Sequence, residues 1–128
     1  MKLLLDTCTF LWLSADRARL SKSALQTLED SRNECYLSAA SAWEIGIKYS
    51  SGRLPLPQKP DVYVPLMREA AGISDLNVDE ESALHAARFA RFHSDPFDRI
   101  LVAQAIVHGM TILTPDPHID QYAVRVLW

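Results

Sequence analysis

Short, continuously apolar runs that lead into acidic residues are the feature that most constrains the fold of this chain. Leu3-Leu4-Leu5 precedes Asp6, and Thr111-Ile112-Leu113 comes shortly before Asp116. A short run without polar alternation is typical of a strand buried on both faces, as in a parallel sheet covered by helices on both sides. We therefore expect buried strands between two layers of helices.

The pattern between these runs predicts strands that alternate with helices. Predicted strands cover residues 2–6, 35–38, 73–78, 110–113 and 124–127. Predicted helices cover residues 20–28, 39–49, 61–71, 79–92 and 96–108, another begins between 9 and 13, and a turn or short helix covers 117–122. Ser21 is a candidate N-cap, Gly109 is expected to end the helix before it, and three prolines make 53–60 a loop. The alternation predicts a three-layer α/β/α sandwich with a mostly parallel central sheet, in one domain spanning residues 1–128.

Composition is that of an ordinary globular protein. The chain has 128 residues, of which 48% are hydrophobic and 23% charged. The formal net charge of -3 weakly opposes extended nucleic-acid binding, although metal-binding carboxylates lower the formal charge and bound cations reverse the local field. Cys8 and Cys35 have no metal-site spacing and are expected to be reduced thiols. No apolar segment has the length of a signal-peptide core or a membrane span, so a cytoplasmic location is expected.

Four acidic residues interrupt or end apolar segments, and they predict a metal site. Asp6 and Asp116 follow strands whose carboxyl ends share one edge of a parallel sheet, while Glu44 and Asp98 lie near the starts of helices. Unpaired carboxylates are costly in apolar surroundings, and oxygen ligands suit magnesium or manganese. Taken singly, Asp6 and Asp116 are also explained as turn residues.

The two helical acids also have ordinary structural explanations. Glu44 fits a capping box with Ser41 or an ion pair with Lys48 one turn later. Asp98 could be an acid in the first turn of a helix, where the helix dipole favours a negative charge, with Asp95 as the N-cap of that helix. These alternatives remain open at the level of sequence.

Four segments together resemble PIN-domain ribonucleases, specifically the VapC-like toxins of bacterial toxin–antitoxin pairs. The resemblance spans nearly the whole chain. The matching segments, in the order of the family, are Leu3-Leu4-Leu5-Asp6-Thr7, Ser41-Ala42-Trp43-Glu44-Ile45-Gly46-Ile47-Lys48, the segment from His93 to Ala105, and Ile112-Leu113-Thr114-Pro115-Asp116.

The resemblance implies a metal-dependent endoribonuclease. It implies that Asp6, Glu44, Asp98 and Asp116 hold Mg²⁺ or Mn²⁺. Thr7 and Thr114 resemble hydroxyl residues that flank the site, and Asp95 is a further acid beside it. The family resemblance also implies RNA as substrate, a cognate antitoxin as partner and a homodimer.

Several other residues have expected roles beside the acids. Metal-activated water needs no histidine base, so His85, His93, His108 and His118 are expected to be mostly structural, with His93 and His118 closest to the acids. Arg99 and Lys48 are the basic candidates for phosphate contacts, with Arg53 and Lys59 nearby. Trp43 is expected in the core, and Trp12 at an interface.

Other function classes are weaker matches. A phospho-acceptor receiver domain needs paired acids after the first strand and a late lysine, but Asp6 stands alone and no lysine follows Lys59. A haloacid-dehalogenase-like phosphatase needs a second acid two residues after Asp6, where Cys8 stands. A non-catalytic PIN-like binding module is the remaining alternative.

Overall fold

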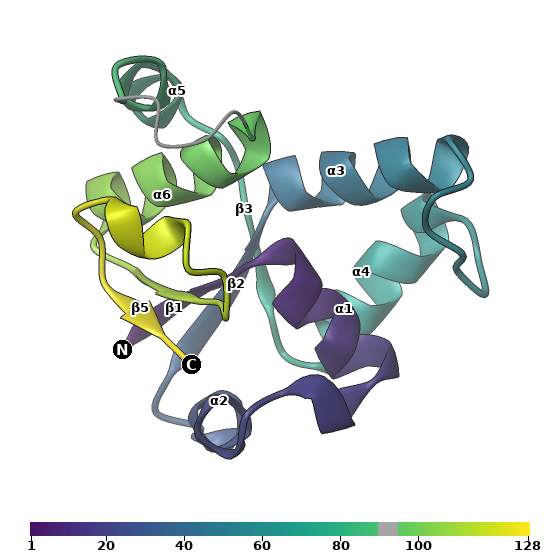
Figure 1. Ribbon diagram of the computed structural model, residues 1–128. Helices are drawn as coiled ribbons and strands as arrows, with labels where there is room; N and C mark the ends of the chain where they lie inside the picture. The colour runs from purple at the N-terminus through teal and green to yellow at the C-terminus, as the bar shows by residue number, and fades with distance from the viewer. Residues whose placement is uncertain (90–94) are drawn as a thin grey trace.

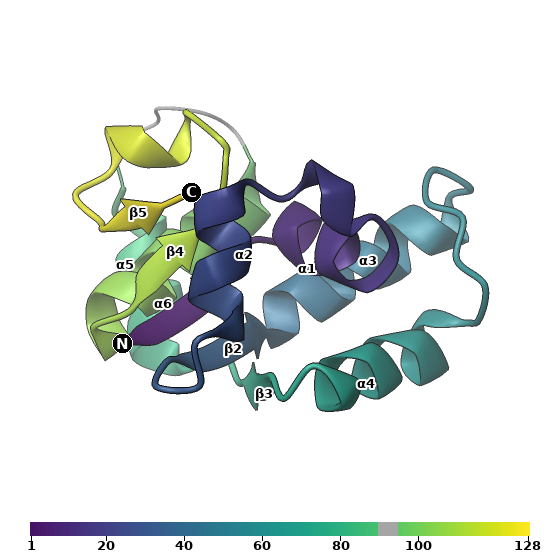
Figure 2. The same cartoon turned by 90° about the horizontal axis from the view of Figure 1, so that it is seen from below.

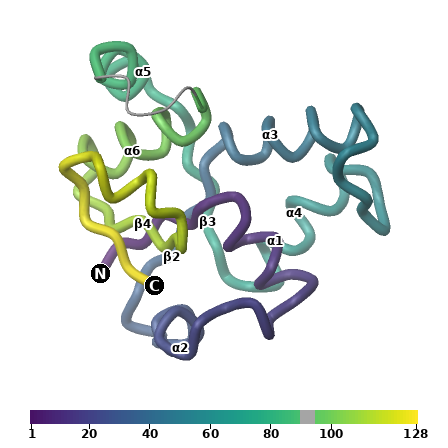
Figure 3. The backbone as a smooth tube through the Cα atoms, viewed as in Figure 1, coloured from purple at the N-terminus to yellow at the C-terminus, as the bar shows by residue number. Residues whose placement is uncertain are grey.

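The sheet at the centre of the molecule has five parallel strands in the order β3-β2-β1-β4-β5 (Figure 1). The computed structural model describes residues 1–89 and 95–128. The strands are β1 Lys2–Leu5, β2 Glu34–Ser38, β3 Ser74–Leu76, β4 Thr111–Leu113 and β5 Val126–Leu127. β1 and β5 flank β4, and both termini lie on the same side of the molecule in Figure 3.

Helices cover both faces of this sheet (Figure 2). They are α1 Thr7–Ala15, α2 Lys22–Glu29, α3 Ala39–Ser50, α4 Pro60–Ala70, α5 Glu80–Ala87 and α6 Pro96–His108, with short 3₁₀ turns η1 Arg17–Arg19 and η2 Ile119–Gln121. Leu4 and Ile112 pack against Leu101 of α6 on one face. Leu5, one residue along β1, packs on the opposite face with the cluster that contains Phe10 of α1. The predicted α/β/α sandwich with a parallel sheet is confirmed.

Local sequence signals account for several helix ends. The Ser21 hydroxyl caps α2 by accepting from the backbone N–H of Ala24, and Asp95 caps α6 by accepting from Phe97. Gly109 ends α6 with φ 67°, a left-handed conformation that costs glycine little. These predictions from capping residues are therefore confirmed.

The helix predicted over residues 79–92 is too long. It ends at Ala87, because the backbone N–H groups of Arg88 and Phe89 bond three residues back, to His85 and Ala86, in tight turns. Residues 90–94, where the predicted helix continued, lie outside the described residues. The strand predicted over 73–78 is also shorter, at Ser74–Leu76.

The prediction that Trp43 belongs to the core is wrong. Its side chain is 67% exposed, and its indole contacts the ring of Phe97 edge to face at 5.4 Å. The buried face of α3 is formed by Ala40, Ser41, Glu44 and Ile45, so Trp43 falls beside it. Trp12, predicted at an interface, is half-buried and packs edge to face on Trp128 of the same chain.

Within the part of the chain that the structure describes, no helix is both long and apolar enough to pass through a lipid bilayer.

Candidate metal centre

Three of the four predicted acids meet at the carboxyl edge of the sheet. One oxygen each of Asp6, Asp98 and Asp116 lies within 4.8 Å of the other two. The arrangement follows from the sheet, because Leu5 and Leu113 are register partners at the ends of adjacent parallel strands. Asp98 joins them from the first turn of α6. We call these residues the three-carboxylate group.

Asp6 is held rigidly by its neighbours. Its Oδ1 accepts from the backbone N–H of Thr7 at 2.7 Å, which caps α1. Its Oδ2 accepts from the hydroxyl of Thr114 at 2.6 Å and lies 3.6 Å from the Cys8 sulfur. The side chain is therefore fixed by both β4 and α1 before any ion is bound.

Burial and mutual repulsion make this carboxylate group unfavourable without a cation. Asp98 is only 8% exposed, and burial, followed by the charges of Asp6, Asp95, Asp116 and Glu44, raises its pKa to about 8. Burial is also the main cause that raises the pKa of Asp6. A hard divalent cation with oxygen ligands would remove this cost, so the donor set fits Mg²⁺ or Mn²⁺.

Glu44 lies beside the three-carboxylate group rather than within it. The Thr7 hydroxyl donates to its Oε1 at 2.7 Å, and the Lys48 ammonium group donates to its Oε2 at 2.6 Å. Its negative charge still raises the pKa of both Asp6 and Asp98. The ion pair with Lys48 is confirmed, but the capping box with Ser41 is wrong, because Ser38 caps α3.

Asp116 combines a turn role with membership of the group. Its Oδ1 accepts from the backbone N–H of His118 at 2.9 Å and lies 3.0 Å from His118 Nδ1. Its own backbone N–H donates to the Thr114 hydroxyl at 3.1 Å. Thr114 therefore links Asp6 and Asp116, the acids that follow β1 and β4.

Lys48 and Arg99, the two candidates for phosphate contacts, have different surroundings. Lys48 is 43% exposed while it pairs with Glu44, so it borders the site. The Arg99 guanidinium donates to the backbone carbonyls of Ala86 and Phe89, at 3.0 and 3.5 Å, at the end of α5. A phosphate contact by Arg99 stays a prediction.

Two histidines contact side chains away from the acids, while His118 contacts Asp116. His85 packs on the ring of Phe89, and His108 Nε2 lies 2.8 Å from Asp79. His93 lies outside the described residues.

Sequence reasoning missed two neighbours of the acids. The sequence predicts only a reduced thiol at Cys8, but this residue stands two positions after Asp6 in the first turn of α1, and its sulfur lies 3.6 Å from Asp6 Oδ2. Thr9 donates to the carbonyl of Leu113 at 2.8 Å and so binds the start of α1 to the end of β4. Their closeness in sequence to Asp6 was the available signal.

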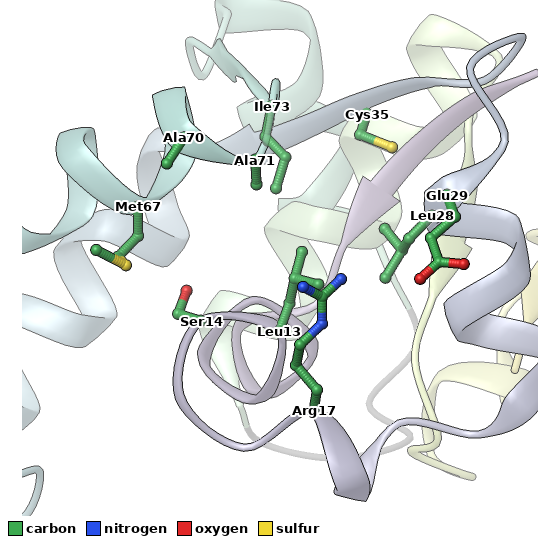
Figure 4. Close-up of a pocket in the computed structure, with 10 residues that line it drawn as sticks. All are labelled: Leu13, Ser14, Arg17, Leu28, Glu29, Cys35, Met67, Ala70, Ala71 and Ile73. Carbon is green, nitrogen blue, oxygen red and sulfur yellow. The ribbon is translucent and has the colours of Figure 1, made fainter.

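A separate pocket lies between α1, α2 and α4, with a volume of about 300 Å³ (Figure 4). Leu13, Leu28 and Met67 line it, together with Cys35. None of the predicted site residues borders this pocket.

Comparison with known proteins identifies the family. The PIN domain model matches residues 3–125, so the chain belongs to the PIN domain family. It is 42% identical over 73 residues to Ribonuclease VapC16 of Mycobacterium tuberculosis, a match covering 57% of this chain and 50% of that protein. It is 31% identical over 114 residues to Ribonuclease VapC22 of the same organism, covering 88% of this chain and 85% of that protein.

Solved structures share the fold. The structure of VapBC2 from Rickettsia felis bound to a promoter DNA fragment aligns with a TM-score of 0.75 and 12% identity, covering 99% of this chain and 98% of that chain. VapBC-1 from nontypeable Haemophilus influenzae aligns with a TM-score of 0.72 and 16% identity, covering 99% and 97%. The resemblance to VapC-like PIN proteins drawn from the sequence is therefore confirmed.

Proposed function

We propose that this protein is a metal-dependent endoribonuclease that hydrolyses RNA phosphodiester bonds, and the toxin of a toxin–antitoxin pair. The observation that carries the proposal is the three-carboxylate group, positioned at the sheet edge of a PIN domain chain. The two curated relatives, both named as VapC ribonucleases, support the same activity.

In this proposal each acid has a distinct task. Asp6, Asp98 and Asp116 hold Mg²⁺ or Mn²⁺, which when bound would lower the pKa of a water molecule and offset charge on the phosphate. Thr7 and Thr114 keep Glu44 and Asp6 in fixed orientations through the bonds at 2.7 and 2.6 Å. Glu44, outside the three-carboxylate group, orients the attacking water.

The RNA substrate must approach a negatively charged group of carboxylates, so positive groups at its border matter. Lys48 stands at this border and balances the charge of Glu44. We assign it a contact with a phosphate next to the scissile bond. There its ammonium group can donate to a phosphate oxygen instead of to the carboxylate of Glu44. Asp95 supports the site by capping α6 and so setting the position of Asp98.

Partners follow from the same proposal. Related folds occur in VapBC structures and in a toxin–antitoxin complex from Klebsiella pneumoniae, which aligns with a TM-score of 0.62 and 15% identity, covering 98% of this chain and 96% of that chain. We propose a cognate antitoxin that suppresses cleavage, and a homodimer. Purification of the chain from its own cells with any protein bound to it, followed by a test for loss of cleavage in the complex, tests the first of these.

The central experiment compares cleavage of total RNA by the wild type and by Asp6→Asn and Asp98→Asn, each with Mg²⁺ or Mn²⁺. Both variants are expected to lose activity by at least about 100-fold, because each removes a charged ligand. Asp61→Asn, at an exposed position on α4, is the matched control and should cleave as the wild type does. Unchanged cleavage in both site variants, or in excess chelator, contradicts the proposal.

A further inference from the structure

Arg19 is a positive side chain that the structure holds in place without an acidic partner. Its guanidinium carbon lies 4.3 Å from the centre of the Trp12 ring, a cation–π contact. Trp12 in turn packs edge to face on Trp128, with ring centres 5.9 Å apart. Arg19 is exposed, and among the described residues its guanidinium forms no ion pair or hydrogen bond. We call Trp12, Arg19 and Trp128 the Arg19 cluster, and the N–H donors of this guanidinium are available to a ligand.

The Arg19 cluster lies at the same edge of the sheet as the three-carboxylate group. Leu113 of β4 pairs with Leu127 of β5, so Trp128, the next residue, is level with Thr114. Thr114 donates to Asp6 at the end of β1. Neighbouring strands lie about 4.8 Å apart, so the backbone of Trp128 is two strand spacings, or roughly 10 Å, from that of Asp6. Figures 1 and 2 show the C-terminus beside α2, the helix that follows η1.

Charge makes this side of the metal centre favourable for a phosphate chain. Residues 12–22 contain three cations and one acid, Asp16, in a chain whose formal net charge is -3. Lys48 lies on α3, which follows β2, so Lys48 and the Arg19 cluster flank β1 and β4 from opposite sides. A guanidinium presents a planar fork of donors that bonds two phosphate oxygens at once. A phosphate chain that crosses the metal centre would therefore meet a positive group on each side.

We propose that the Arg19 cluster binds the phosphate backbone of the RNA substrate a few nucleotides from the scissile bond. At about 3.4 Å per stacked nucleotide, a separation of roughly 10 Å corresponds to about three nucleotides. The two tryptophans hold the guanidinium in place, so binding costs less rotational freedom than it would for an unrestrained arginine. Arg17, two residues earlier, borders the pocket of Figure 4 together with Glu29 and belongs to a different surface. This inference rests on the proposed function.

Fluorescence anisotropy with a short labelled single-stranded RNA tests the proposal, in excess chelator so that no cleavage occurs. Arg19→Gln should raise the Kd at least about fivefold and make the slope of log K against log salt concentration shallower by about 0.7, as for one lost phosphate contact. Arg17→Gln is the matched control, because it removes the same charge two residues away from a different surface. Its Kd should stay within about twofold of the wild type, with the same slope.

Several outcomes overturn the proposal. These are no measurable binding by the wild type, an unchanged Kd and slope in Arg19→Gln, and equal weakening by Arg17→Gln. Unchanged RNA affinity in Arg19→Gln, combined with loss of a protein that co-purifies with the wild type, also overturns it and assigns the cluster to a protein partner. Because this measurement involves no cleavage, a protein that binds RNA through Arg19 but cleaves nothing refutes the nuclease function and leaves the Arg19 contact standing.

Discussion

Asp6 performs two tasks with one side chain, since it caps α1 and belongs to the three-carboxylate group. Asp98 is likewise a first-turn acid of α6, and Asp116 is likewise a turn residue. The ordinary structural explanations of these acids are therefore compatible with a metal site. Both roles can coexist because strand ends and first helical turns present backbone N–H groups that favour carboxylates.

Removing one charge from this group should stabilise the metal-free protein. We expect Asp98→Asn to raise its free energy of unfolding by roughly 1 kcal/mol, or its Tm by about 4 °C, because a buried carboxylate beside two others is lost. The same variant should lose the stabilisation that Mg²⁺ gives the wild type, which is about 2.7 kcal/mol in the free energy of unfolding at 100 times the Kd. Thermal melts with and without Mg²⁺ measure both. A lower Tm in the metal-free variant contradicts this view of the site.

The Thr114 hydroxyl is expected to set the metal affinity through Asp6. Thr114→Val keeps the shape of the side chain but removes the 2.6 Å bond to Asp6 Oδ2, so the Kd for Mg²⁺ should rise about tenfold. Thr114→Ser retains the hydroxyl and should stay within about twofold of the wild type. Calorimetric titration separates the two variants, and equal Kd values for both argue against this role.

At the scale of elements, the position of α6 decides the site, because this helix supplies Asp98. Its start is capped by Asp95, and its side contacts α5 through the bond from Arg99 to the Ala86 carbonyl. Its last residue, His108, lies 2.8 Å from Asp79, the N-cap of α5. Polar contacts thus join these two helices at both ends.

The contact between Asp79 and His108 predicts a pH dependence of stability. His108 first, and then the Ser82 hydroxyl, lower the pKa of Asp79 below its ordinary value. Below about pH 4 the unfolded chain then binds more protons than the folded chain, so this stabilisation is present above that pH and is lost as the pH falls. Asp79→Asn should lower the Tm at pH 7, and the difference from the wild type should begin to shrink as the pH falls below about 4. A Tm difference that does not change with pH contradicts the assignment.

At the scale of the whole molecule, an exposed apolar surface adjoins the metal centre. Trp43 is 67% exposed, and it lines a cavity of about 460 Å³ together with Val78, Phe97 and Ile100. Exposed apolar surface of this kind is typical of protein–protein contacts. It is the surface on which we expect the proposed homodimer to form.

A charge at this surface should separate the subunits. We expect Trp43→Glu to weaken self-association by at least about tenfold, because aromatic residues dominate interface energies. Leu66→Glu, at a 47% exposed position on α4, is the control and should leave the mass unchanged. Light scattering coupled to size-exclusion chromatography measures both. A Trp43→Glu protein with the wild-type dimer mass contradicts this placement.

Local sequence determined the elements, because periodicity, caps and apolar runs act within a few residues. It predicted α6 from Pro96 to His108 and the strands before Asp6 and Asp116. It also predicted that four acids converge at one sheet edge, and three of them do, while Glu44 lies beside them. Tertiary structure alone decided the rest. Which side of α3 is buried, and so the exposure of Trp43, depends on packing against distant segments. The same holds for the turn of Arg99 toward α5 and the approach of Cys8 to Asp6. Such contacts arise from the positions of whole elements, which no short stretch of sequence encodes.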